Sequence, residues 1–435
     1  MEILKYFTDP VLRAPTIGCM LMCLSSSLVG ILVVIRKRSL LGEALSHASY
    51  PGVVLSIVLM ATFFSFSEEF MVLGILAGAF ISALAGLFAI DFLEKKLRIK
   101  NDAALCLVLS LFFGVGLLIA SRIQTTHTLW YKQIQLFLFG QAATMTDVHI
   151  LIYGILAFFV LVVLCLLYRF IEILYFDREY AKTLNMPTML IESVLFFLLV
   201  LSIVIGIRSV GVVLMSAMLI SPVVAARQFT HHLKKLFFLS GFFGICAGFI
   251  GNYLSLELSV FMSQKQQLKF SFPTGPMIVL TSSFFCFVAL LFAPKGLVSH
   301  YFRHWKFKER CLQENLLKLL WKEGVPLSRK TLERKQHLSP FFLSWLLWKM
   351  RQRHWIVSVN KNMYQLTEAG MQRGAHIVRL HRLWEAYLVY MGQGREKVHQ
   401  NAEEMEHILT PEMEKELTEL LHHPKKDPHQ QPIPE

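Results

Sequence analysis

Histidine and glutamate residues recur at helical spacing near the end of the chain. His381 and Glu385 are four positions apart. Four more residues follow at offsets of zero, four, seven and eight: His399, Glu403, Glu406 and His407. This spacing predicts that the last four share one stripe of one helix. Imidazole nitrogens and carboxylate oxygens on two facing helices could bind a divalent metal, although a solvated, salt-bridged helix has the same pattern.

A second acid–imidazole pair, Glu43 and His47, lies in an otherwise apolar segment. Their spacing of four places a carboxylate and an imidazole on one helical face. Oxygen and nitrogen ligands suit Mn²⁺, Fe²⁺ or Zn²⁺, and ionisable residues beside membrane spans are costly enough to be functional candidates. The alternative is an acid at a helix end and a hydrogen-bonded histidine near the membrane interface.

These two groups of residues belong to parts of different composition. Long apolar runs fill the chain up to about Ala293, and the remainder is rich in Lys, Arg, Glu and His. A spanning helix needs about 20 mostly apolar residues, so residues 1–294 are expected to form a transmembrane domain. The predicted spans are 16–35, 50–66, 70–92, 103–121, 149–169, 189–207, 209–227, 236–255 and 275–293.

Basic residues predict the orientation of these spans. The clusters at 36–38, 94–100 and 227–235 fall on one side of the predicted membrane, and residues 295–310 fall on the same side. Cytoplasmic loops collect Lys and Arg, so the C-terminal region is expected in the cytosol and the spans in the inner membrane. This bias also accounts for the net charge of +13, which is weak support for nucleic-acid binding.

Three segments carry a family resemblance. Gly42-Glu43-Ala44-Leu45-Ser46-His47, followed by Pro51-Gly52, resembles the G-D-A-L-S-H-x-x-x-P-G segment of manganese/zinc/iron ABC-importer permeases. Residues 176–187 and 211–226 resemble two further segments of that family. The resemblance implies that Glu43 and His47 line the transport path. Glu43 stands where the family usually has Asp, and Asn185 where it has Gly.

The same resemblance implies several partners. The chain contains no G-x-x-x-x-G-K-[ST] motif, so ATP hydrolysis is expected from a separate cytosolic ATPase. An extracytoplasmic metal-binding protein would deliver the ion, and a second permease copy or a paralogue would complete the pore. The resembled cytosolic segment would bind the ATPase through Asp177, Glu179, Ala181, Asn185 and Pro187.

Residues 311–373 predict a winged helix-turn-helix. Apolar spacing indicates a helix at 312–321. Further helices are expected at 329–336 and, after Ser339 as N-cap, at 340–352, and residues 355–359 and 363–367 are typical of a two-stranded wing. An unspecific small α+β domain is the alternative. The candidate DNA-binding residues are Ser339, Ser344, Lys349 and Arg351.

The C-terminal residues resemble the diphtheria-toxin-repressor family. The similarity lies in His381-Arg382-Leu383-Trp384-Glu385 and in residues 398–399, 406–407 and 423–434. It implies a homodimeric repressor that binds operator DNA, with Fe²⁺ or Mn²⁺ as co-repressor and residues 374–435 as the metal-sensing and dimerisation domain. By position, the implied metal ligands are Cys311, Glu314, His381, Glu385, His399, Glu403, Glu406 and His407. Glu403 matches manganese-type members, but Cys311 supplies sulfur, so Fe²⁺ and Mn²⁺ both stay open.

Together these features predict an all-α polytopic membrane protein with eight or nine spans, a cytosolic winged helix-turn-helix and a helical metal-binding domain. The combination resembles the permease–repressor fusions of chlamydial metal importers. Residues 295–310 would be a linker and a candidate cleavage region. A membrane-anchored, metal-responsive transcription factor without transport activity is the main alternative. No HExxH or GxSxG motif supports a membrane hydrolase.

Overall fold

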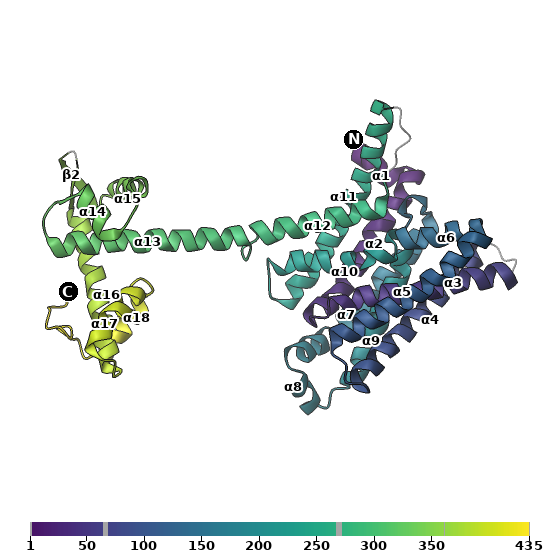
Figure 1. Ribbon diagram of the computed structural model, residues 1–435, viewed down its shortest axis with the longest axis horizontal. Helices are drawn as coiled ribbons and strands as arrows, with labels where there is room; N and C mark the ends of the chain where they lie inside the picture. Colours follow the sequence, from purple (N-terminus) through teal and green to yellow (C-terminus); the bar gives the residue numbers. More distant parts are fainter. Residues whose placement is uncertain (1, 64–67, 267–271, 361, 435) are drawn as a thin grey trace. The chain divides into compact units, whose positions relative to one another are not determined.

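The computed structural model describes residues 2–63, 68–266, 272–360 and 362–434. The chain divides into two compact units, Met1–Ser299 and His300–Glu435. The first unit is a bundle of helices, and the second combines helices with a small sheet (Figure 1). The apolar part and the polar part of the sequence therefore correspond to separate folded units.

The first unit contains mostly long apolar helices. Their bounds are α1 (Glu2–Thr8), α2 (Pro10–Ile35), α3 (Leu40–Phe63), α4 (Glu68–Lys95), α5 (Asn101–Thr126), α6 (Thr128–Phe139), α7 (Asp147–Phe176), α8 (Arg178–Thr183), α9 (Thr188–Val210), α10 (Val212–Arg227), α11 (Leu233–Gln266) and α12 (Thr274–Phe292). A short 3-10 helix, η1 (Ala142–Thr144), precedes α7.

Eight helices in the described part of the chain are long and apolar enough to cross a membrane: α2, α3, α4, α5, α7, α9, α11 and the segment that begins with α12. The predicted span at 209–227 is wrong, because Gly211 ends α9 and α10 has only 16 residues. At 1.5 Å per residue α10 is about 24 Å long, shorter than a bilayer core of roughly 30 Å. The protein is thus a multi-pass membrane protein, and the eight candidate spans of its described residues lie at the lower end of the predicted eight or nine.

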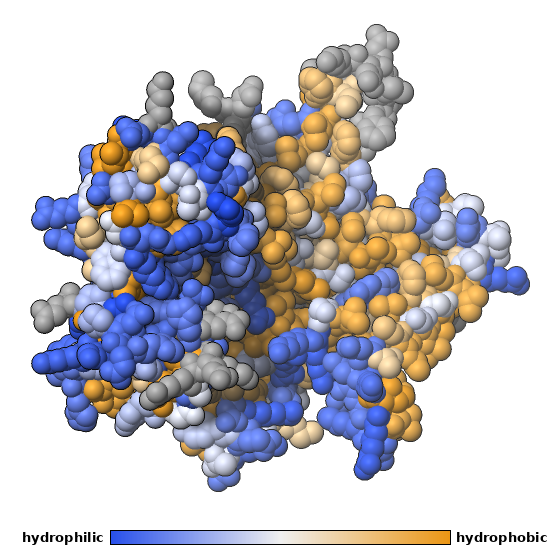
Figure 2. Space-filling view, turned by 60° about the vertical axis from the view of Figure 1, so that its left-hand side comes forward, coloured by the Kyte–Doolittle hydropathy of each residue, from blue (hydrophilic) through white to orange (hydrophobic). Residues whose placement is uncertain are grey.

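Burial separates central from peripheral helices. The most apolar stretches of α2 and α3 are 72% buried, whereas those of α4, α5 and α7 are 28% buried. Helix α2 packs against α7, α10 and α11, and α3 packs against α4, α5 and α10. Figure 2 shows hydrophobic side chains over a broad part of the bundle surface, as expected for helices that face lipid. Residues on α3 are therefore well placed to face the interior.

Two glycines permit the close packing around α10. A Cβ on Gly30 would lie 1.8 Å from the backbone oxygen of Leu219, so α2 and α10 approach closely only because Gly30 has no side chain. Gly211 has a φ of +94°, which L-residues with side chains rarely adopt. The break between α9 and α10 therefore depends on glycine at that position.

The second unit comprises most of α13 together with a winged helix-turn-helix and three further helices (Figure 1). Its elements are α13 (Leu297–Glu323), β1 (Leu327–Ser328), α14 (Arg329–Gln336), α15 (Pro340–Gln352), β2 (Ile356–Asn360), β3 (Met363–Leu366), α16 (Glu368–Tyr390), α17 (Arg395–Met405) and α18 (Pro411–Leu420). The antiparallel sheet has the order β1-β3-β2. The second and third predicted helices and the predicted wing are confirmed.

Two hydrophobic cores stabilise this unit. One forms where α13, α14, α15 and the sheet meet, around Leu317, Leu332 and Leu346. The other, around Trp384 and Ala402, joins α16 to α17 and α18. Since α13 begins at Leu297, most of the predicted linker at 295–310 is helical.

The predicted single stripe of His399, Glu403, Glu406 and His407 is wrong in one respect. Helix α17 ends at Met405, Glu406 is its C-cap, and His407 lies in the following turn. Because α17 ends there, Glu406 and His407 can turn towards α13 and α16. The side chain of Glu403 remains 57% exposed on α17.

Candidate functional sites

The pair Glu43 and His47 lies inside α3, within the bundle rather than before a span as the sequence suggested. His47 is 8% exposed, and its ring lies edge-on to Phe113 of α5 with 4.4 Å between centroids. Its Nδ1 atom is buried and has no hydrogen-bond partner among the described residues. Burying an unpaired polar atom is costly. This nitrogen is therefore available as a ligand beside the Glu43 carboxylate.

Other ionisable residues near the spans have structural partners. Asp91 accepts from Lys95 at 2.5 Å on α4. The backbone N–H of Thr146 donates to His149 Nδ1 at 3.1 Å at the start of α7. Such contacts explain these residues without transport. The α3 pair remains the strongest candidate for binding a transported ion.

The predicted ATPase-docking segment forms α8 and its flanks. Asp177 is the N-cap, and its carboxylate accepts from the backbone N–H groups of Glu179 and Tyr180 at 3.0 Å each. Asn185 has a φ of +53°, a left-handed conformation that Asn tolerates, so it can replace the glycine of the resembled family. Ala181 is fully buried and Pro187 is the N-cap of α9.

Three exposed apolar residues on this segment were missed by the sequence analysis. Phe176, Tyr180 and Leu184, here named the α8 apolar set, are 94%, 54% and 49% exposed. They follow at four-residue intervals, which was the available signal. The predicted residue Glu179 is exposed too, but it forms an ion pair with Lys182 at 2.8 Å. Exposed apolar groups amid polar ones are typical of protein contact sites.

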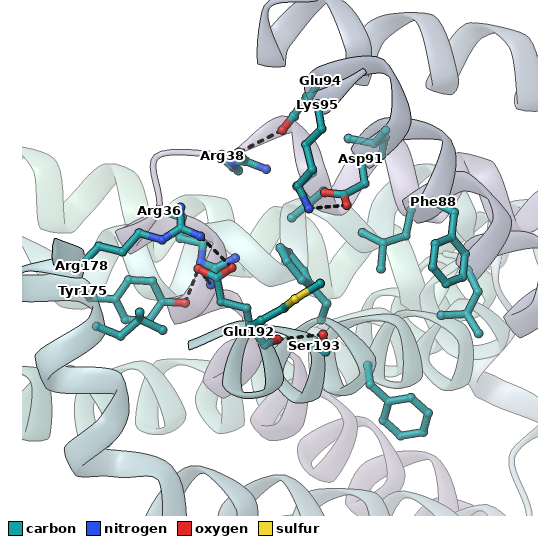
Figure 3. Close-up of a pocket in the computed structure, with 18 residues that line it drawn as sticks. Arg36, Arg38, Phe88, Asp91, Glu94, Lys95, Tyr175, Arg178, Glu192 and Ser193 are labelled. Carbon is teal, nitrogen blue, oxygen red and sulfur yellow. Dashed lines mark hydrogen bonds and ion pairs between the residues drawn. The ribbon is translucent and has the colours of Figure 1, made fainter. Parts of the chain in front are cut away.

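A polar network connects α8 to the loop before α3. It borders a pocket of about 520 Å³ (Figure 3). Glu192 of α9 binds Arg178 of α8 at 3.1 Å and Arg36, which follows α2, at 3.2 Å. Arg36 also donates to the hydroxyl of Tyr175 at 2.9 Å. Residues 36–39 lead directly into α3, so the network joins the docking segment to the helix that carries Glu43 and His47.

In the second unit, α16 and α17 bring His381, Glu385 and His399 together, here named the α16 cluster. One ligand atom from each residue lies within 4.8 Å of the others. His381 Nε2 is 3.0 Å from both Glu385 Oε1 and His399 Nδ1, and His399 Nδ1 is 2.6 Å from Glu385 Oε1. Two imidazole nitrogens and one carboxylate oxygen converging on one point fit a divalent transition metal.

Hydrogen bonds within and beside this cluster shift the pKa values of Glu385 and His381. Burial would raise the pKa of Glu385, but hydrogen bonds with His381 and His399 outweigh it and lower the pKa to about 2. Burial would lower the pKa of His381, but hydrogen bonds to Glu385 and Glu406 raise it overall. The Glu385 carboxylate is therefore ionised at neutral pH, as a metal ligand must be.

A lysine that the sequence analysis did not single out lies beside this cluster. Lys318 of α13 donates to Glu406 Oε2 at 2.8 Å and Oε1 at 2.9 Å, and its Nζ lies 3.1 Å from His381 Nδ1. Glu406 also contacts His381 Nδ1. Burial raises the pKa of Glu406, yet His381 and Lys318 together lower it overall. Lys318 follows Glu314 by four positions on the same helical face, which was the signal in the sequence.

The remaining predicted ligands lie at different points around the α16 cluster. His407 Nδ1 is 2.8 Å from Glu314 Oε2, which links the turn after α17 to α13. Arg310 and Arg373 also contact Glu314, at 3.1 and 3.4 Å. Cys311 is partly buried one turn earlier on α13. Glu403 is only 4.0 Å from Lys318 and otherwise exposed, so the structure does not bring all eight predicted ligands to one point.

The predicted DNA-binding residues lie on or next to α15. Ser339 is its N-cap, and the Ser344 hydroxyl donates to the Pro340 backbone oxygen at 2.7 Å. Lys349 is paired with Glu309 of α13 at 2.5 Å. Arg351 is exposed and can reach a phosphate.

The exposed face of α15 also contains large apolar side chains. Phe341 is 87% exposed and Trp348 is 58% exposed. Trp345 lies 5.2 Å from Trp305 of α13 between ring centroids. The exposed face of α15 therefore offers large apolar side chains where polar groups would be needed to read base edges.

Two family models match the chain. The model described as the ABC 3 transport family matches residues 8–293. The model described as the iron dependent repressor, metal binding and dimerisation domain, matches residues 367–435. Between them they cover the helical bundle and the region that contains the α16 cluster.

Similar proteins include relatives that align with most of this chain. A probable metal transport system membrane protein of Chlamydia trachomatis serovar D is 35% identical over 439 residues, covering 98% of this chain and 97% of that protein. The manganese transport system membrane protein MntC of Bacillus subtilis is 31% identical, covering 86% of this chain and 83% of that protein.

A solved structure resembles the helical bundle. PsaBC from Streptococcus pneumoniae in complex with Fab aligns with a TM-score of 0.55 and 27% identity. The alignment covers 68% of this chain and 96% of that chain.

Proposed function

The chain belongs to the ABC 3 transport family, and from that membership we propose that it is the permease subunit of an ABC importer for a divalent transition metal. It also carries a C-terminal metal-dependent repressor domain. The proposed cargo is Mn²⁺, Fe²⁺ or Zn²⁺, and the manganese transport relative favours Mn²⁺. The ion would be carried by one part of the chain and sensed by another.

The observation that carries the transport proposal is the α3 pair. His47 offers a buried nitrogen without a partner among the described residues, one helical turn from the Glu43 carboxylate. A divalent ion that leaves water in the bundle needs such replacement ligands. Glu43 and His47 would supply one oxygen and one nitrogen, with further ligands from water or from a second permease subunit.

ATP hydrolysis is proposed to come from a separate cytosolic ATPase that binds α8. The α8 apolar set provides contact area, and Glu192 connects Arg178 to Arg36 ahead of α3. Nucleotide-driven movement of α8 would thereby reach the α3 pair. The other proposed partners are an extracytoplasmic metal-binding protein and a second permease copy or paralogue.

The proposed location is the inner membrane, with the second unit in the cytosol. The arginines at 36 and 38, Lys95 and Arg178 all border the pocket of Figure 3, so basic residues gather at one end of the bundle. Positive residues prefer the cytoplasmic side. The ATPase and DNA would be available on that side.

The proposed domains follow the predicted boundaries. Residues 1–294 would form the transporter, 295–310 a linker, 311–373 the DNA-binding domain and 374–435 the sensing and dimerisation domain. Fe²⁺ or Mn²⁺ is the proposed co-repressor, held by the α16 cluster. The other predicted ligands near it are Cys311, Glu314, Glu403, Glu406 and His407, of which Glu406 is paired with Lys318. A homodimer would then bind operator DNA through α15.

The test is ATP-dependent uptake of Mn²⁺, Fe²⁺ and Zn²⁺ by vesicles that contain this chain and its ATPase. We expect ATP-dependent uptake of at least one of these ions. Metal-dependent DNA binding without any uptake would instead support a membrane-anchored transcription factor that does not transport.

A further inference from the structure

The side chain of Lys318 is placed where a bound cation would be expected. Lys318 is 5% exposed and Glu406 is 2% exposed. The ammonium contacts both Glu406 oxygens at 2.8 and 2.9 Å. A buried carboxylate needs a counter-charge. Lys318 supplies it.

The two ring nitrogens of His381 face different groups. Its Nε2 faces Glu385 and His399, where no basic side chain is in contact among the described residues. Its Nδ1 faces Glu406 and the Lys318 ammonium at 3.1 Å. His381 thus lies between two cation positions, the α16 cluster on one side and the position filled by Lys318 on the other.

An ammonium and a divalent metal cannot share the second position. The ammonium is a donor with no lone pair to offer a metal. It also uses both oxygens of Glu406, and two cations at hydrogen-bonding distance in a buried site repel strongly. Metal could enter only if the four-carbon side chain of Lys318 moved away.

We propose that Lys318 is a resident cation of the sensing unit, which fills the position between His381 Nδ1 and Glu406 and keeps a divalent ion out of it. The inference rests on the proposed metal-sensing function. Lys318 lies on α13, whereas its partners lie on α16 and at the end of α17. The ammonium therefore ties α13 to the sensing helices, and the response to metal depends on the α16 cluster.

The test counts bound Mn²⁺ on the full-length chain in detergent by equilibrium dialysis. Lys318→Met and Lys318→Gln should each bind one more ion per chain than the wild type, because the position between His381 Nδ1 and Glu406 becomes free. Mn²⁺ bound at the α3 pair contributes equally to the variant and the wild-type counts, so it cancels in the difference between them. Lys335→Met is the matched control, since Lys335 pairs with Glu323 at the surface, and it should bind the wild-type number of ions.

Two further variants locate the extra ion and separate the hypotheses. Adding Glu406→Gln to Lys318→Met should return the count to that of the wild type. If both Lys318 variants bind the wild-type number, the proposal is overturned. If His381→Ala in the wild-type background leaves the count unchanged, the proposed sensing function fails, whatever Lys318 does.

Folding is followed by hydrogen exchange of α16 and α17. Loss of protection in Lys318→Met that Mn²⁺ restores supports the proposal, because the ion then replaces the missing charge. Loss that Mn²⁺ does not restore in either Lys318 variant contradicts it.

Discussion

At the scale of single residues, the second unit pairs buried charged and polar groups across helices that are far apart in the sequence. Glu314 of α13 binds His407, and Lys318 of α13 binds Glu406. Removing one partner of such a pair leaves an uncompensated buried charge, which is far more costly than losing a surface ion pair. The side chains beside the α16 cluster therefore also hold the DNA-binding and sensing helices together.

Combined substitution of Glu406→Ala and His407→Ala should lower Mn²⁺ affinity and operator-DNA affinity together. The expected loss of Mn²⁺ affinity is roughly tenfold or more, because Glu406 contacts Nδ1 of His381 behind the α16 cluster and substitutions behind metal ligands cost 10–100-fold. Dialysis with Mn²⁺ and DNA-binding titrations on the full-length chain measure the two effects. Glu416→Ala with His422→Ala, two exposed residues of the same types, is the matched control. DNA binding that is unchanged and independent of metal would contradict the prediction.

The sequence predicted part of this residue-level arrangement. His381, Glu385 and His399 do come together, because i,i+4 spacing on α16 and a facing helix fix their relative positions. The role of Lys318 depends on contacts over 63 and 88 positions, which local spacing cannot reveal. Likewise, the exposure of Glu403 depends on where α17 ends.

At the scale of elements, α8 is a short polar helix between two long apolar ones, with unusual apolar exposure. Substituting the α8 apolar set with Ala should reduce co-purification of the ATPase, because it removes contact area without altering the Asp177 cap. Roughly 1–3 kcal/mol per fully buried large apolar side chain is at stake. Phe229→Ala, an exposed residue in the loop after α10, is the control. Unaltered co-purification would show that the ATPase binds elsewhere.

Element boundaries were predicted unevenly. Helices 329–336 and 340–352 match α14 and α15, because a serine caps each of them at its N-terminus, Ser328 and Ser339. The start of α3 at Leu40 was missed, since residues 40–49 are too mixed for a hydropathy window. The shortness of α10 was missed as well, because Gly211 interrupts a run that remains apolar on both sides.

At the scale of the whole molecule, a membrane-bound repressor has a geometric difficulty. Winged helix-turn-helix repressors bind operators as symmetric dimers, and DNA near an anionic bilayer is repelled. Residues 297–310 lie within helix α13, so a protease would need local unfolding to cleave there. We nevertheless predict release by cleavage between residues 294 and 310.

An immunoblot of native cells with an antibody to the C-terminal region tests this release. A soluble fragment that contains residues 311–435 is expected beside the full-length chain. If operators are occupied in cells that contain the full-length species alone, the tethered form represses directly and the prediction is wrong.

The most direct test of the account is Mn²⁺ uptake by vesicles that contain the ATPase and either the wild-type chain or His47→Ala. His47 provides a buried nitrogen ligand on α3, so the variant should insert normally, bind the ATPase and lose uptake down to the leakage of empty vesicles. His231→Ala, in the exposed loop between α10 and α11, should transport like the wild type. Wild-type uptake by His47→Ala would contradict the assignment of the metal path to the α3 pair.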